Sequence, residues 1–245
     1  MDELRKAVEE VELVDGHAHN IVPLDSTFPF IRAFTGASGD ALTFSPHSLS
    51  FKFYSYVRTQ TSPRNLKDIA ELYGCESTLQ SVEDYRRVNG IQSICSTCFK
   101  TARISTILID DGFEVDKMHY IEWHKSFSPL VGRILRIERV AEQILEEGDV
   151  KISLNQAYTH PLTRLLNINV TAAGEIYGFK SIAAYYSGLE INTNVTKKDA
   201  EEGLTQVLAG GKPVCIANKN VVDYIFLQSL EIAQSYDLPV QIHTG

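Results

Sequence analysis

The sequence predicts an α/β fold in which parallel strands alternate with helices. Two observations support this prediction: short apolar runs are separated by segments of helical periodicity, and polar residues gather where the predicted strands end. A (β/α) barrel and a doubly wound sheet both have this pattern, and both place their sites at the carboxyl ends of the strands. The chain contains about five strand positions, whereas a closed barrel needs eight.

Composition excludes several classes of protein. The 245 residues carry a net charge of −8 and are 44% hydrophobic and 22% charged, which is typical of a globular protein. The acidic balance does not favour nucleic-acid binding, and no apolar run is long enough to span a membrane. The first ten residues lack the apolar run of a secretory signal. Low cysteine usage indicates free thiols in a reducing compartment, so we expect a cytoplasmic protein.

The first predicted strand covers residues 11–15 and stops at Gly16. A long excursion follows, through about residue 102, and helices are expected in it from about residue 45. Ser77 and Gln80 match a capping box for one of these helices. A later helix with one apolar face is predicted from the spacing of Ile91, Ile94, Cys95, Cys98, Phe99 and Ala102.

Four further strands are predicted at residues 104–109, 131–137, 176–182 and 239–242. Helices are expected between them, from about Val140 to Glu147, along the stripe that begins at Ala200, and through Val221 to Ala233. Thr196 and Asp199 resemble an N-terminal cap for the second of these helices. Residues 149–175 show no clear pattern.

The strongest local signal is the run DGHAHN at residues 15–20, directly after the first predicted strand. Alternate residues of an extended segment point to the same side, so His17 and His19 present two imidazoles together. Neutral imidazoles suit Zn²⁺, Fe²⁺ or Mn²⁺, and Gly16 leaves room for a metal. Isolated pairs of this kind also occur in surface loops, but the position at a strand end favours a metal site.

Two further basic residues accompany later strands. His243 follows the run at 239–242, and in a barrel it would reach the same rim as the first-strand histidines. The alternative is a histidine that binds nothing. Lys180 lies inside the apolar run at 176–182, where an amine is costly unless it reaches a partner or an open rim. It could bind a carboxylate substrate or, once carboxylated, a metal; the alternative is an amine that extends to solvent.

Asp110 and Glu138 also end strands and are candidates to bind substrate or to orient a metal-bound histidine. Acidic residues at such positions frequently cap helices instead. Cys95 and Cys98 have the C-x-x-C spacing, but they lie on the apolar face of a predicted helix, which favours buried thiols over a redox pair. The sequence contains no G-x-S-x-G elbow, P-loop or G-x-G-x-x-G motif.

Taken together, the motifs VDGHAHN, ILIDDGF, GFKSIAAYYSGL and LPVQIHTG resemble the amidohydrolase superfamily. The most similar group is the amidohydrolase-related branch at the amino end of plant nodulin/glutamine synthetase-like fusion proteins. The resemblance runs in order along residues 1–245, with residues 149–175 matching poorly.

The resemblance implies a metal-dependent hydrolase-type (β/α) TIM barrel, incomplete at about its first five β/α units. It implies one domain over residues 1–245 with a helical insertion at about 45–102. In this scheme His17, His19 and His243 bind one divalent ion, Zn²⁺ first and Mn²⁺ or Fe²⁺ as alternatives. Lys180 falls near the position where some relatives carry a carboxylated lysine and is the candidate catalytic residue. The implied activity is hydrolysis of C–N or C–O bonds in a small molecule.

The superfamily pattern also has a histidine after the sixth strand and an aspartate after the eighth. This sequence has no counterpart of either, so we expect a truncated chain with impaired activity. The second hypothesis is a non-catalytic regulatory or interaction domain of a glutamine synthetase-like fusion protein. A small-molecule substrate is the expected partner, and a homo-oligomer stays open.

Overall fold

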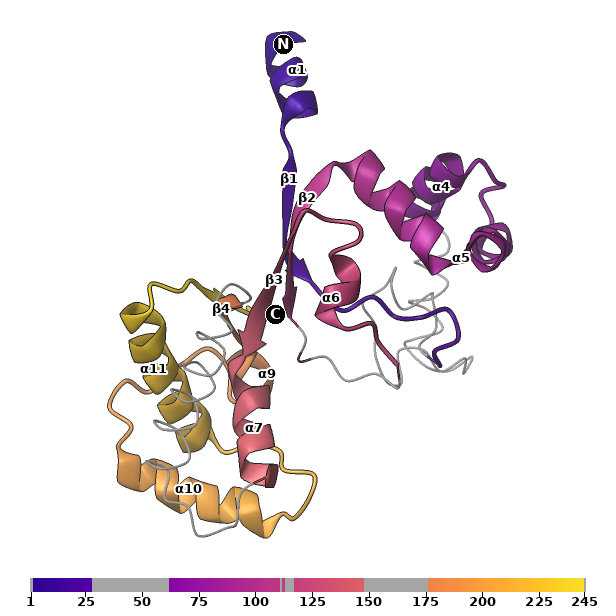
Figure 1. The fold of residues 1–245 in the computed structure, drawn as a ribbon. Helices are drawn as coiled ribbons and strands as arrows, with labels where there is room; N and C mark the ends of the chain where they lie inside the picture. The colour runs from indigo at the N-terminus through magenta and orange to yellow at the C-terminus, as the bar shows by residue number, and fades with distance from the viewer. Residues whose placement is uncertain (1, 28–61, 111, 113–116, 148–175, 245) are drawn as a thin grey trace. The chain divides into compact units, whose positions relative to one another are not determined.

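The computed structural model describes residues 2–27, 62–110, 112, 117–147 and 176–244. The chain divides into two compact units (Figure 1). Unit 1 comprises Met1–Asn20, Ile104–Phe113 and Ile121–Gly245, and unit 2 comprises Ile21–Arg103 and Glu114–Tyr120. Unit 1 contains the sheet and all six candidate site residues, so the site can be described within this unit alone.

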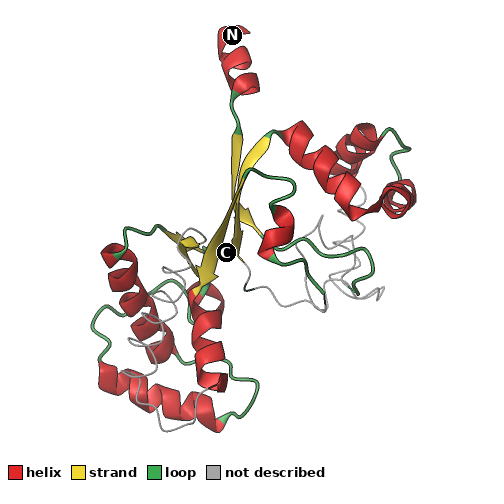
Figure 2. Cartoon of the chain, viewed as in Figure 1, coloured by secondary structure: helices red, strands yellow, loops and turns green. Residues whose placement is uncertain are grey.

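Five parallel strands form a single sheet in the order β1-β2-β3-β4-β5 (Figure 2). They are β1 (Leu13–Ala18), β2 (Ile104–Asp110), β3 (Leu130–Arg136), β4 (Ile176–Ser181) and β5 (Val240–Ile242). Each predicted strand coincides with one of these, so the strand predictions are confirmed. The first strand continues beyond its predicted end at residue 15, and it therefore includes His17.

The prediction of a (β/α) TIM barrel is wrong for the described residues. A barrel requires its last strand to pair with its first, whereas β1 and β5 are the two edges of an open sheet. The regular alternation of strand and helix also fails after β1, because the next described helices, α4 (Ser62–Tyr73) and α5 (Leu79–Ala102), belong to unit 2. The fold is an α/β fold with an open five-stranded parallel sheet.

The two faces of the sheet carry different side chains. Cα partners in parallel strands point to the same side, so Arg136, Lys180 and Gln241 share one face. The Gln241 side chain, on β5, donates a hydrogen bond to the carbonyl of Gly16, on β1, at 2.5 Å. This bond joins the two edges, so the sheet curls and this polar face is its concave side. Phe179, the neighbour of Lys180, points to the opposite, convex side.

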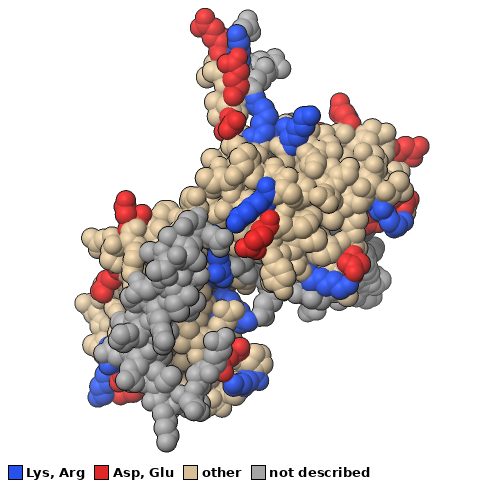
Figure 3. All heavy atoms as spheres, in the orientation of Figure 1, with Lys and Arg blue, Asp and Glu red and all other residues tan. Residues whose placement is uncertain are grey.

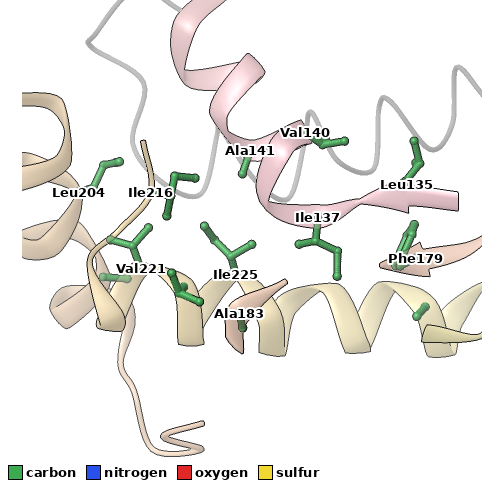
Figure 4. Close-up of a cluster of buried hydrophobic side chains, with 13 residues drawn as sticks. Leu135, Ile137, Val140, Ala141, Phe179, Ala183, Leu204, Ile216, Val221 and Ile225 are labelled. Atoms are coloured by element: carbon green, nitrogen blue, oxygen red, sulfur yellow. The ribbon is translucent and has the colours of Figure 1, made fainter. Parts of the chain in front are cut away.

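The main hydrophobic core lies on the convex side, between the sheet and three helices (Figure 4). These are α7 (Ile137–Glu147), α10 (Lys197–Ala209) and α11 (Lys219–Ser235). Phe179 is fully buried there with Leu135 from β3 and Ile225 from α11. Two short helices, α6 (Ile121–His124) and α9 (Ala183–Tyr186), also belong to unit 1, as does α1 (Asp2–Glu10). The core thus holds β3 and β4 from their convex side.

The helix predictions differ in outcome at their first residues. The cap at Thr196 is confirmed: its hydroxyl accepts a hydrogen bond from the Asp199 amide, and the Asp199 carboxylate accepts one from the Thr196 amide. The capping box at Ser77 is wrong by one residue, because the cap of α5 is Thr78, which accepts from the amide of Ser81. Residues 149–175, for which the sequence shows no clear pattern, lie outside the described residues.

Unit 2 contains the predicted cysteine-bearing helix. Ile94 is buried in a small core with Tyr73, and Cys98 packs against that core. Cys95 is also buried, and burial raises the pKa of its thiol to about 11. All four cysteines of the chain are free. The interpretation of Cys95 as a buried thiol is confirmed, since a redox-active cysteine needs a lowered pKa.

The charged residues on the face of the molecule in Figure 3 are of both signs and interspersed. None of the described helices has the length and apolar character that crossing a bilayer would need.

Candidate functional site

The two first-strand histidines lie side by side, as their spacing predicts. Their ring centroids are 5.6 Å apart with the rings edge to face, and both side chains are exposed. The Nδ1 atom of His19 lies 2.9 Å from the backbone carbonyl oxygen of Asp110, at the end of β2. A carbonyl only accepts, so His19 carries its hydrogen on Nδ1 and leaves Nε2 without one in the neutral ring.

Lys180 reaches these histidines from β4. Its side chain is 4% exposed, and its Nζ lies 3.2 Å from Nε2 of His17. Burial lowers the pKa of the Lys180 amine; the carboxylate of Asp110 opposes this and the guanidinium of Arg136 adds to it. Partial desolvation, followed by the charges of Lys180 and His19, also lowers the pKa of His17. Both shifts favour the neutral forms of the two bases.

The carboxylate of Asp110 is held by an arginine that the sequence did not single out. Arg136, at the end of β3, donates from Nη2 to Oδ2 of Asp110 at 2.6 Å and from Nε to both carboxylate oxygens at 3.2 Å. Asp110 is 1% exposed. Its predicted role in binding substrate stays a prediction, but its carboxylate already has a strong internal partner.

Glu138 and His243 lie around Ser181, at the end of β4. Glu138 is 2% exposed, and its Oε1 accepts from the Ser181 hydroxyl at 2.7 Å and from the Ile182 amide at 3.0 Å. The backbone amide of His243 donates to the Ser181 carbonyl at 3.0 Å, and its ring stacks on Tyr185 with centroids 4.3 Å apart. Within the described part of the chain, Oε2 of Glu138 and Nε2 of His243 are buried without a hydrogen-bond partner.

The buried Glu138 carboxyl predicts a pH-dependent stability. Burial raises its pKa above the ordinary value, against the opposing effect of the hydrogen bonds from Ser181 and Ile182. The folded state therefore binds the proton more tightly than the unfolded state, so this stabilisation is lost as the pH rises through the raised pKa. Glu138→Gln cannot ionise. We expect its free energy of unfolding to exceed that of the wild type by an amount that grows as the pH rises above the ordinary pKa of a glutamic acid.

Urea unfolding at a series of pH values measures this difference. Glu202→Gln is the matched control, because the Glu202 side chain is 68% exposed and should leave the pH profile unchanged. A Glu138→Gln profile parallel to the wild type would contradict a buried, ionising carboxyl at this position.

The site residues meet some of the needs of a metal ion. His17 and His19 supply two neighbouring imidazoles, and the hydrogen bond at Nδ1 of His19 leaves Nε2 as the nitrogen that would bind an ion, as in many metal sites. The unpartnered Nε2 of His243 is also of the type that binds metals. However, the residues that the structure describes contain no group of three or more His, Cys, Asp or Glu side chains placed to hold an ion. The first-strand pair thus fits half of a coordination sphere, and the structure does not join His243 to it.

Sequence reasoning missed Arg136 and Gln241. Arg136 ends β3 just as Asp110 ends β2, so its position at the carboxyl end of a strand was a usable signal. Gln241 alternates with the apolar residues Val240 and Ile242 in a short strand, which indicates the polar face. Their partners, Asp110 and Gly16, could not be inferred from either pattern.

Comparisons with known proteins were made for sequence and for structure. No family model matches the chain. Protein fluG of Emericella nidulans is 24% identical over 277 aligned residues. The alignment covers 100% of this chain and 30% of fluG. A solved structure of a candidate metal-dependent hydrolase from Lactobacillus casei superposes with a TM-score of 0.74 at 20% identity, over 99% of this chain and 60% of that one. The chain therefore shares the fold of the Lactobacillus protein and spans less than two thirds of either relative.

Proposed function

We propose that this chain is the metal-binding part of a hydrolase of the amidohydrolase type, which acts on C–N or C–O bonds of a small molecule. The observation that carries the proposal is a group of three nitrogen bases: the imidazole of His17 on β1, that of His19 directly after β1, and the buried amine of Lys180 beside His17. The likeness in fold to a candidate metal-dependent hydrolase supports the same reading. The motifs shared with the amidohydrolase superfamily add to this support.

His17 and His19 would hold one divalent ion, and Zn²⁺ is the first choice because two neutral imidazoles suit it. His243 would be a third ligand. When bound, the metal would activate a water molecule and polarise the substrate. The protein's own residues have separate tasks: the Asp110 carbonyl orients His19, and Lys180 acts on the substrate next to His17. Asp110 and Glu138 are proposed to act indirectly. Asp110 positions these groups, and Glu138 positions the end of β4.

The further properties are proposals of the same kind. The partner would be a small-molecule substrate, with a glutamine synthetase-like segment joined to this chain in a longer protein. The free cysteines support a reducing, cytoplasmic location.

A second candidate is a non-catalytic regulatory or interaction domain. One observation favours it: among residues 2–27, 62–110, 112, 117–147 and 176–244 no three metal-binding side chains converge. A domain of this kind would keep the sheet and the first-strand histidines without turnover.

Metal content and hydrolysis distinguish the two candidates. We expect the purified protein to bind about one Zn²⁺ or Mn²⁺ per chain, measured by inductively coupled plasma mass spectrometry, and to hydrolyse members of a panel of small amides, esters and lactones. His17→Asn with His19→Asn should remove both the metal and the turnover. His119→Asn, in unit 2, is the control and should retain both. Wild-type protein that neither binds these ions nor hydrolyses any compound would contradict the proposal and favour the non-catalytic domain.

A further inference from the structure

The orientation of His19 depends on the backbone of one residue. Its Nδ1 donates to the Asp110 carbonyl at 2.9 Å, a contact between residues that are 91 positions apart in the sequence. The contact can hold the imidazole in one tautomer only if the carbonyl of Asp110 keeps its direction. Asp110 is the last residue of β2 and still pairs with Ile134 of β3, so the direction of its carbonyl depends on this last strand pair and on the contacts that hold the chain just beyond it.

Arg136 clamps this turn at both ends. Three of its contacts go to the Asp110 carboxylate, and its Nη1 donates to the Gly112 carbonyl at 3.0 Å. The Gly112 amide closes the turn by donating to Oδ1 of Asp110 at 3.1 Å. A Cβ atom at Gly112 would lie 2.8 Å from Cβ of Arg136, so only glycine admits the arginine this closely.

Burial strengthens the hydrogen bonds between Arg136 and Asp110. Asp110 is 1% and the Arg136 side chain 14% exposed, so water competes little for these hydrogen bonds. A guanidinium donates in a planar fork that a lysine amine cannot reproduce. Arg136 therefore orients the Asp110 carboxylate as well as balancing its charge.

We infer that Arg136 is a positioning residue, which holds Asp110 so that the Asp110 carbonyl keeps the hydrogen of neutral His19 on Nδ1 and leaves Nε2 unprotonated. The proton placement follows from the geometry alone. That the unprotonated Nε2 of His19 binds a metal rests on the proposed function. Residues that orient a metal-binding histidine in this way typically change metal affinity by about 10–100-fold when they are replaced.

The test is the tautomer of His19, read in metal-free protein by two-bond ¹H–¹⁵N correlation spectra of the imidazole at a pH where the ring is neutral. The test variant is Arg136→Met combined with Asp110→Asn, because Arg136→Met alone would leave a buried, unpaired carboxylate that can unfold the protein. Arg136→Lys keeps the charge without the fork and retains Asp110. Arg139→Met combined with Glu142→Gln is the matched control, since Arg139 also pairs with a buried carboxylate, that of Glu142, at 3.4 Å.

We expect one His19 tautomer, with hydrogen on Nδ1, in the wild type and in the Arg139→Met, Glu142→Gln control. The double variant should show a mixture of tautomers, and Arg136→Lys an intermediate state. An unchanged His19 spectrum in both Arg136 variants would overturn the inference, as would hydrogen on Nε2 in the wild type. A Zn²⁺ titration of the same samples should show affinity about 10–100-fold weaker in the double variant. If the tautomer shifts but no sample binds Zn²⁺, the positioning role stands and the proposed function fails.

Discussion

Lys180→Met is expected to lower the turnover number by about 100-fold or more, because the proposed function places this amine on the substrate and the loss of an acid or base in such a position has an effect of this size. The same variant should be more stable than the wild type. Among the described residues Lys180 has no ion pair, although it is 4% exposed, and burying such an amine costs free energy that a methionine avoids. Methionine also fills nearly the same volume, so it leaves no cavity.

Lys180→Met should therefore combine a gain in stability with a loss of turnover. Steady-state kinetics and urea unfolding on one preparation measure both. Lys198→Met serves as control, because the Lys198 side chain is 84% exposed and replacing it should change neither quantity. A Lys180→Met protein that is destabilised would show that the amine is a structural group, and one with full turnover would remove Lys180 from the chemistry.

The strands could be predicted because each is a short apolar run whose burial depends on local pattern. The runs at β2 and β3 are bounded by polar residues, and both lie close to their predicted ends. The prediction for the first strand ends too early. Gly16 indicates an end there, whereas the extended backbone continues to Ala18. A glycine in a strand stops it only when the backbone turns there.

Closure of the sheet could not be predicted in this way. It depends on whether β5 meets β1, which is a contact between residues more than 200 positions apart, and local pattern carries no information about it. The structure replaces strand pairing at this point with a single side-chain bond, from Gln241 to Gly16. The family resemblance supplied the barrel, and the described strands correct it.

The site was predicted in part for the same reason. His17 and His19 follow from the two-residue period of one strand, which holds without any tertiary contact. The meeting of Lys180 with His17 depends on the curl of the whole sheet, and the pairing of Arg136 with Asp110 on the register of two strands. Sequence alone placed these residues at strand ends, and only the assembled sheet shows which of them meet.

Phe179→Ala is expected to cost about 3–5 kcal/mol in the free energy of unfolding, the range for a phenylalanine removed from a well-packed core. Phe179 is fully buried and packs with Leu135 and Ile225 behind the sheet (Figure 4). Helices on one side and strands on the other limit how far the core can collapse into the space left. Urea unfolding followed by circular dichroism measures the loss, and Leu189→Ala, at a half-exposed leucine of the same unit, should cost about 0.5 kcal/mol or less.

This position also connects the core to the site. Phe179 and Lys180 are consecutive residues of β4 and point to opposite faces, so the packing that holds one determines where the other lies. Phe179→Leu, which keeps most of the apolar volume, should therefore recover most of the stability and, with it, the geometry at Lys180. If Phe179→Ala lost less than about 1 kcal/mol, the convex core would not be what fixes β4. The position of the amine beside His17 would then have to come from the concave face itself.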